Sequence, residues 1–140
     1  MPITDDAGIR ALSDLDRIAV VGCSSTPGKA AHDVPRYLSE HGYDIYPVNP
    51  FAEEILGREA VDTLADVQDD VELVEVFRPS DEVPTIVDQT LARQASHGDV
   101  EAIWLQLGIT HDEALRRAED GGLRTTQDRC LKIEHRRLVK

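Results

Sequence analysis

The sequence predicts an α/β fold in which a parallel sheet of about five strands lies between two layers of helices. Short apolar runs alternate with segments of helical periodicity, which is the pattern of repeated βαβ units. The runs are rich in β-branched residues and show little polar alternation, as expected for strands covered on both faces. The chain has 140 residues, the size of one domain. We therefore expect a single Rossmann-like three-layer domain over residues 1–140.

The chain is expected to begin with a helix within residues 1–16. Thr4 precedes this helix as its N-cap, and Ile9 and Leu12 fall on one face. We expect the helix to cover the edge of the sheet. The apolar run 18–21 follows and is too short for a helix, so we predict a strand there.

A second helix and a second strand are predicted between residues 30 and 50. Pro35 fits the helix only in its first turn, because a proline further inside removes a hydrogen bond. Gly42 ends the helix, residues 43–48 form the next strand, and Asn49-Pro50 stops that strand. The side chains that share the apolar face of this helix are Val34, Tyr37, Leu38 and His41.

The middle of the chain combines an irregular segment with the clearest helix. Residues 51–70 are expected to be irregular, with a short strand or turn around 55–61 and a short helix near Leu64. A strand is predicted over 71–77. Ser80 then caps a helix with acidic residues in its first turn. The apolar stripe of that helix comprises Val83, Ile86, Val87, Thr90 and Leu91.

The last strand–helix–strand unit is predicted from residue 102 onward. Residues 102–107 form a strand, and Thr110 and Glu113 make a capping box for the following helix. A final strand over 123–126 leads into a basic tail at 129–140.

Charge and hydropathy exclude several classes of protein. The chain has 27 acidic and 15 basic residues and a formal net charge of −12. Such a field repels nucleic acid and anionic lipid, so neither is expected as a partner. The longest stretch without a charged residue, 18–28, is far shorter than the roughly 20 residues that cross a bilayer. The amino terminus lacks the basic start of a signal peptide, so we expect no membrane span and a soluble, cytoplasmic protein.

The acidic composition has two interpretations. Dense carboxylates and only three lysines resemble the surfaces of proteins from salt-loving organisms. An ordinary acidic cytosolic protein would have the same composition. The halophilic interpretation predicts that stability rises with salt.

In an open parallel sheet, ligands bind beyond the carboxyl ends of the strands. The expected site therefore lies in the loops 22–32, 49–57, 77–83 and 106–112.

The first of these loops is suited to an anion. Gly22 permits a tight turn out of the strand, Ser24 and Ser25 offer hydroxyl and amide donors, and the next helix points its amino end at the loop. Lys29 adds a positive charge. A generic strand-to-helix turn would use the same residues, so this loop alone does not identify a ligand.

The second and third loops narrow the class of nucleotide. Nicotinamide cofactors with a free ribose diol usually meet an acid at the end of the second strand, where this chain has Asn49-Pro50. A phosphorylated ribose is not repelled there. Arg78 follows the third strand and either contacts a phosphate or balances Glu72 and Glu75.

Five separated motifs, in order, are Ile-Ala-Val-Val-Gly-Cys-Ser-Ser-Thr-Pro at 18–27, Tyr-Pro-Val-Asn-Pro at 46–50, Val-Glu-Val-Phe-Arg-Pro at 74–79, Ile-Trp-Leu-Gln-Leu-Gly at 103–108 and Asp-Arg-Cys-Leu-Lys-Ile-Glu-His at 128–135. Together they resemble the small stand-alone coenzyme A (CoA)-binding proteins. Those proteins are similar to the nucleotide-binding domain of the succinyl-CoA synthetase alpha subunit. One departure is Cys23, where relatives commonly have alanine.

The resemblance implies that the domain holds CoA or an acyl-CoA. It places the pyrophosphate at residues 24–26, the adenosine end between 49–50 and 78–83, and the segment 105–107 on the far side. Lys29 or Arg78 would meet the 3′-phosphate. The expected cofactor-contacting residues are Gly22, Ser24, Ser25, Thr26, Lys29, Asn49, Pro50, Arg78, Val83, Gln106 and Gly108.

No arrangement of nucleophile, acid and base, and no metal-ligand spacing, is found in the sequence. Cys23 is either a small core residue or a thiol activated at a helix amino end, and Cys130 is expected to be structural. The leading hypothesis is a non-catalytic CoA-binding module. The alternatives are a small nucleotide-dependent oxidoreductase or acyl-CoA-handling enzyme completed by a partner subunit, and a regulatory protein that reports CoA occupancy. A homodimer through a sheet edge or a helix face is a further alternative.

Overall fold

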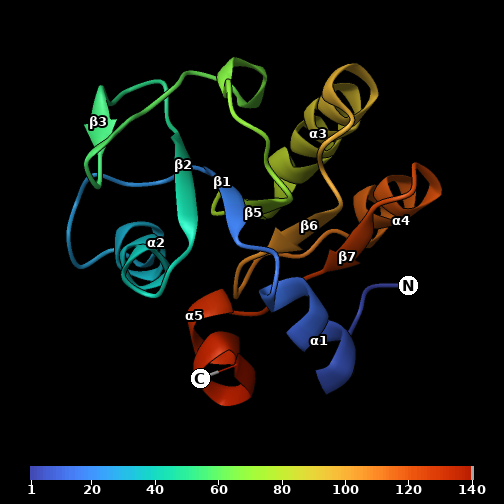
Figure 1. Cartoon of the computed structure of the whole chain (residues 1–140). Coiled ribbons are helices and arrows are strands. Elements are labelled where there is room, and N and C mark those ends of the chain that lie inside the picture. Colours follow the sequence, from blue (N-terminus) through green and yellow to red (C-terminus); the bar gives the residue numbers. More distant parts are fainter. Residues whose placement is uncertain (140) are drawn as a thin grey trace.

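The computed structural model describes residues 1–139 and contains a sheet of five parallel strands. Across the sheet the order is β2-β1-β5-β6-β7, and every neighbouring pair is parallel. This arrangement confirms the predicted Rossmann-like three-layer fold (Figure 1). The strands are β1 (Arg17–Val21), β2 (Asp44–Val48), β5 (Leu73–Val76), β6 (Ala102–Leu105) and β7 (Arg124–Thr126).

Helices cover both faces of the sheet. One face carries α1 (Asp6–Ser13), α2 (Ala30–Glu40) and α5 (Leu131–Glu134), which continues into the π-helical turn η3 (His135–Val139). The other face carries α3 (Val83–His97) and α4 (Asp112–Asp120) (Figure 1). The smaller elements are the antiparallel pair β3 (Glu54–Ile55) and β4 (Arg58–Glu59), and the 3₁₀ turns η1 (Leu64–Asp66) and η2 (Ser80–Glu82).

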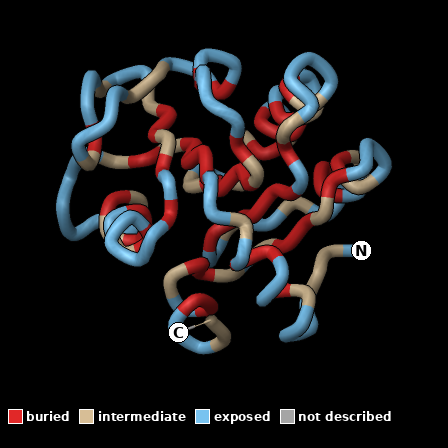
Figure 2. Tube along the Cα trace, viewed as in Figure 1, coloured by how far each residue is buried: buried red, intermediate tan, exposed pale blue. Residues whose placement is uncertain are grey.

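Two hydrophobic clusters form the core, one on each face. Within β1, Ile18 and Val20 belong to the cluster under α1, α2 and α5, whereas Ala19 and Val21 belong to the cluster under α3 and α4. The alternation follows from the pleat of the strand, which points successive side chains to opposite faces. Figure 2 shows the consequence, a buried central sheet with exposed loops around it.

The amino-terminal helix differs from the prediction in its cap and its position. Asp5, not Thr4, is the N-cap, because its carboxylate accepts a hydrogen bond from the amide of Gly8 at 3.0 Å. Ile9 and Leu12 are fully buried in the cluster on the α2 face. The helix therefore covers a face of the sheet and not its edge.

Both caps predicted from serine and threonine are also wrong. The Ser80 hydroxyl accepts a hydrogen bond from the amide of Thr110 at 3.0 Å, which ties the loop after β5 to the loop after β6. No side chain caps α3. For α4, the ring of His111 accepts the amide of Ala114 at 3.1 Å.

Pro35 was expected in the first turn of α2, and this prediction is wrong. The helix begins at Ala30, so Pro35 lies in its second turn. A proline at this position leaves the carbonyl of Ala31 without its usual helical donor. The amide of Ser24 donates to that carbonyl at 2.9 Å. The helix thereby holds the loop that follows β1.

The carboxyl-terminal segment, predicted only as a basic tail, is helical. Leu131, the first residue of α5, is fully buried in the core cluster on the α2 face of the sheet. Arg137 of η3 donates to Asp6 of α1 at 2.8 Å and to Glu134 at 2.7 Å. Among residues 1–139, no helix is both long enough and apolar enough to cross a membrane.

Candidate functional site

A pocket of about 530 Å³ opens at the carboxyl ends of β1, β2 and β5. The neighbours of β1 in the sheet are β2 on one side and β5 on the other, so the strand order reverses at this point. Open α/β sheets bind ligands in such a crevice. The lining residues are Val21, Gly22, Val48, Asn49, Pro50, Phe51, Asp62, Thr63, Leu64, Arg78, Asp81, Glu82, Thr85, Ile86 and Gln89.

The structure brings some of the predicted contact residues together and separates others. Gly22, Asn49, Pro50 and Arg78 line the pocket. Val83 is fully buried in the core. The predicted residues outside the lining are Ser24, Ser25, Thr26 and Lys29, in the loop that leaves Gly22, and Gln106 and Gly108, which follow β6.

Gly22 has a backbone geometry that favours glycine. Its φ is +87°, and its amide donates to the carbonyl of Val48 at 3.0 Å. A Cβ at this position would lie 2.8 Å from Cδ of Arg78. The absence of a side chain therefore lets the stem of Arg78 lie against the end of β1.

The charges in the pocket are mainly negative. Arg78 donates from Nε and Nη2 to the carboxylate of Glu82 at 3.0 and 2.8 Å. This bidentate hydrogen bond lowers the pKa of Glu82 below its usual range. Asp62 and Asp81 also line the pocket. A phosphate that approaches Arg78 must therefore compete with Glu82.

The loop between β1 and α2 keeps several amides available. The amide of Thr26 donates to the Ser24 hydroxyl at 3.0 Å, and the amide of Ser24 is bound to α2 as described above. Within residues 1–139 the amide of Ser25 has no protein acceptor, and Ala30 and Ala31 open the helix, where amides lack intrahelical partners. These groups suit an anion.

Asp33 opposes an anion at this helix end. Its carboxylate accepts the amide of Gly28 at 3.1 Å and lies 3.2 Å from Nδ1 of His32. The amide of Gly28 first, and His32 second, hold the pKa of Asp33 below its usual range. The Asp33 charge offsets part of the helix dipole.

The sequence did not indicate several residues of the pocket. Phe51 is 95% exposed at the rim, next to Pro50. The sequence did contain a signal for Phe51, because an aromatic residue directly follows Asn49-Pro50 in a loop. The segment 62–64 and the exposed face of α3 had no signal, because only tertiary packing brings them to the pocket.

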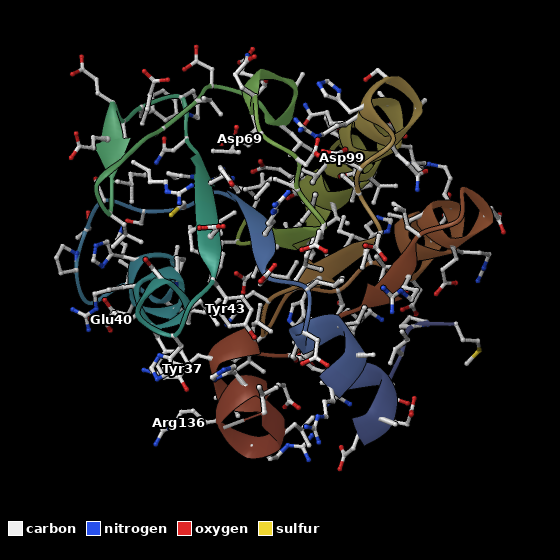
Figure 3. All side chains as sticks on the ribbon, in the orientation of Figure 1. Tyr37, Glu40, Tyr43, Asp69, Asp99 and Arg136 are labelled. Carbon is white, nitrogen blue, oxygen red and sulfur yellow. The ribbon has the colours of Figure 1, made fainter. Side chains whose placement is uncertain are left out.

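A buried arginine supports one wall of the pocket. Arg93 of α3 is 2% exposed and donates to the carbonyls of Leu64 and Val67 at 2.9 and 2.8 Å. It also donates to the carbonyl of Asp69 at 2.9 Å and to the carboxylate of Asp99 at 2.9 Å. Asp69 and Asp99 are labelled in Figure 3. The arginine thus fixes the segment that begins with the lining residue Leu64.

Three buried polar side chains are Cys23 in the loop after β1, Glu75 of β5 and Gln106 directly after β6. Cys23 is fully buried, and burial first, followed by the negative charge of Glu75, raises the pKa of its thiol to about 12. The prediction of a core cysteine is confirmed by this burial, and the environment of the thiol disfavours the thiolate.

Glu75 and Gln106 have buried oxygens without hydrogen-bond partners. Both carboxylate oxygens of Glu75 and Oε1 of Gln106 lack a partner in the described chain. Burial raises the pKa of Glu75 to about 8. Within residues 1–139, no group of three or more histidine, cysteine, aspartate or glutamate residues is arranged to hold a metal ion.

Comparison with known proteins identifies the family. Residues 16–136 match the CoA binding domain family. The Bacillus subtilis protein YneT is 34% identical over 119 residues, covering 85% of this chain and 84% of YneT. The ADP-forming acetate–CoA ligase of Methanocaldococcus jannaschii is 30% identical over 84 residues, which cover 60% of this chain but 12% of the ligase.

Solved structures agree over nearly the whole chain. A Thermus thermophilus protein superposes with a TM-score of 0.87 at 40% identity and covers 96% of this chain and 99% of its own. A hypothetical protein from Pyrococcus horikoshii superposes with a TM-score of 0.90 at 36% identity, over 100% and 97% of the two chains. These matches confirm the resemblance to CoA-binding proteins found in the sequence, and the chain belongs to the CoA binding domain family.

Proposed function

We propose that this protein binds CoA or an acyl-CoA in the crevice between β1, β2 and β5, without catalysis of its own. The observation that carries the proposal is that Gly22, which lines the pocket, also begins the loop that ends at the open amino end of α2. A base pocket joined to an anion-binding loop matches a nucleotide with a diphosphate. Membership of the CoA binding domain family supports CoA as that nucleotide.

The adenosine portion fits the pocket. Its volume of about 530 Å³ lies in the range of small-molecule sites. Phe51 and Ile86 offer apolar surface to a base, and the exposed ring of Phe51 is available for stacking. The carboxylates of Asp62 and Asp81 favour the neutral base, with its amino group, over a phosphate in this part of the site.

The proposed site of the phosphates is the loop that follows Gly22. The amides of Ser25, Ala30 and Ala31 are the proposed donors to the diphosphate, with the ammonium of Lys29 nearby in the sequence. Arg78 is the cation at the pocket and is the proposed partner of the 3′-phosphate, in exchange for Glu82.

The absence of catalysis is part of the proposal. The described lining of the pocket includes neither histidine nor cysteine, and its arginine is paired with a carboxylate. The acetate–CoA ligase match spans a small share of that enzyme, so the ligase reaction is not assigned to this chain.

Calorimetric titration with CoA, dephospho-CoA and NAD tests the proposal. We expect CoA to bind most tightly and dephospho-CoA to bind more weakly, because it lacks the 3′-phosphate. Gly22→Ala should lower CoA affinity at least tenfold, since the new Cβ meets Arg78. Gly42→Ala is the matched control, with a φ of +92° but open space around its Cβ, at the amino end of β2. Failure of the wild-type protein to bind CoA, or tightest binding of NAD, would contradict the proposal.

A further inference from the structure

The side chain of Asn49 contacts the two loops that the proposed CoA site requires. Its Nδ2 donates to the carbonyl of Cys23 at 2.9 Å, in the loop after β1. Its Oδ1 accepts the amide of Phe51 at 2.8 Å, in the loop after β2. One amide group therefore joins the segment that would hold the diphosphate to the segment that would hold the base.

The ends of this link are fixed to the core. The backbone amide of Asn49 donates to the carbonyl of Val61 at 2.8 Å, and the amide of Val61 donates to the carbonyl of Pro47 at 3.1 Å. At the other end, the side chain of Cys23 is fully buried under the sheet face. Neither loop can move relative to the other without breaking the bond between Asn49 and Cys23.

We infer that Asn49 is a positioning residue, which sets the distance between the phosphate loop and the base pocket and does not itself bind CoA. The inference rests on the proposed function. It departs from the sequence-based expectation, in which Asn49 is a contact residue. In nicotinamide-binding sheets the acid at this position faces the ribose, whereas here both polar atoms of the side chain face the protein.

The chemistry of the link requires an amide. A carboxylate at position 49 could accept the Phe51 amide but could not donate to the Cys23 carbonyl. A serine can form the same local turn with the amide two residues ahead, yet it is too short to span to Cys23. Asn49→Ser therefore removes the link, keeps the turn and adds no charge.

The link matters for ligands that touch both loops at once. A ligand that occupies one loop gains nothing from the relative placement of the two. A ligand that spans both binds more tightly when the loops are already in place, because less ordering is needed on binding. Loss of the link should therefore weaken CoA more than either of its halves.

The experiment compares wild type, Asn49→Ser and Gln68→Ser by titration with CoA, with adenosine 3′-monophosphate as the base half, which lacks the diphosphate, and with 4′-phosphopantetheine as the phosphate half, which lacks the base. Gln68 is the control, because its exposed amide also donates to a backbone carbonyl, that of Asp66 at 3.4 Å, but outside the pocket. In Asn49→Ser we expect the affinity for CoA to fall about tenfold, the equivalent of one hydrogen bond. The affinity for each half should stay within about threefold of the wild-type value. Unchanged CoA affinity, or equal losses for all three ligands, would overturn the inference.

Amide hydrogen exchange of the ligand-free proteins gives a second readout. Asn49→Ser should speed exchange at Ser24, whose amide donates to Ala31 of α2, and at Thr26, whose amide donates to the Ser24 hydroxyl, while Gln68→Ser leaves both unchanged. If the wild-type protein binds no CoA, the proposed function fails. The exchange rates then still decide whether Asn49 fixes the loop, and unchanged rates would reject it.

Discussion

Glu75 should make this protein less stable as the pH rises, and Glu75→Gln should remove that dependence. Glu75 lies in the centre of the sheet between Val20 and Trp104, fully buried and without hydrogen-bond partners in the described chain. Burial raises its pKa from 4.5 to about 8. The folded state therefore keeps a proton that the unfolded chain releases, so the free energy of unfolding falls with increasing pH.

The size of the effect follows from the shift in pKa. Each pKa unit corresponds to about 1.36 kcal/mol, so the shift of Glu75 from 4.5 to about 8 amounts to about 5 kcal/mol. The free energy of unfolding keeps this contribution in full below pH 4.5. It loses the contribution progressively between pH 4.5 and 8 and lacks all of it above pH 8. At pH 7 the loss is about 3 kcal/mol. Glutamine has a similar shape and no charge, so it should show none of this decline.

The assay is urea unfolding followed by circular dichroism from pH 5 to pH 9. The quantity to compare is the pH dependence of the difference between Glu75→Gln and wild type, because a buried amide adds a cost that does not vary with pH. Glu40→Gln is the control for removing one negative charge, since Glu40 is exposed on α2 (Figure 3). A difference that stays constant from pH 5 to pH 9 would refute the reasoning.

The other predictions concern the site, one support and the surface. Glu82→Gln should raise CoA affinity about two- to fivefold by releasing Arg78, with dephospho-CoA unchanged; weaker CoA binding would mean that Glu82 orients Arg78. Phe51→Ala should weaken CoA by about 1–3 kcal/mol through lost stacking without changing the melting temperature, because the ring is 95% exposed; unchanged affinity in calorimetry would exclude stacking. Arg93→Met should destabilise by about 3–5 kcal/mol in urea, because the buried Asp99 loses its partner; a loss under 1 kcal/mol would argue against the network. The melting temperature of wild type should rise from dilute buffer into molar KCl if its −12 charge reflects a saline environment, and a flat response would reject that interpretation.

The order of elements was predictable because it depends on local patterns that tertiary packing reinforces. Apolar runs bounded by glycine or proline became the strands, and their loops met at one end of the sheet, as the rule for parallel sheets requires. Gly22, Asn49, Pro50 and Arg78 were therefore placed in the pocket from sequence alone. The same rule could not reveal the segment 62–64, which reaches the pocket through Arg93 and not through a strand.

Local sequence does not reveal the distant partner of a polar group. Ser80 has the local pattern of an N-cap, but its hydroxyl accepts the amide of Thr110 from another loop. Asn49 has the position of a ligand-binding residue, and its side-chain amide bonds to protein groups on both sides. Local sequence states which groups are available, whereas long-range packing determines their partners.

Pro35 has a consequence for attempts to make this protein more robust. Replacing a proline inside a helix normally strengthens the helix, by roughly 3 kcal/mol on intrinsic preference. Here the new amide would compete with Ser24 for the carbonyl of Ala31, which holds the loop after β1 in place. A variant chosen by melting temperature alone would thus gain helical order and release the chain segment beside the crevice. Selection for heat resistance at this position should be paired with a measurement of ligand affinity.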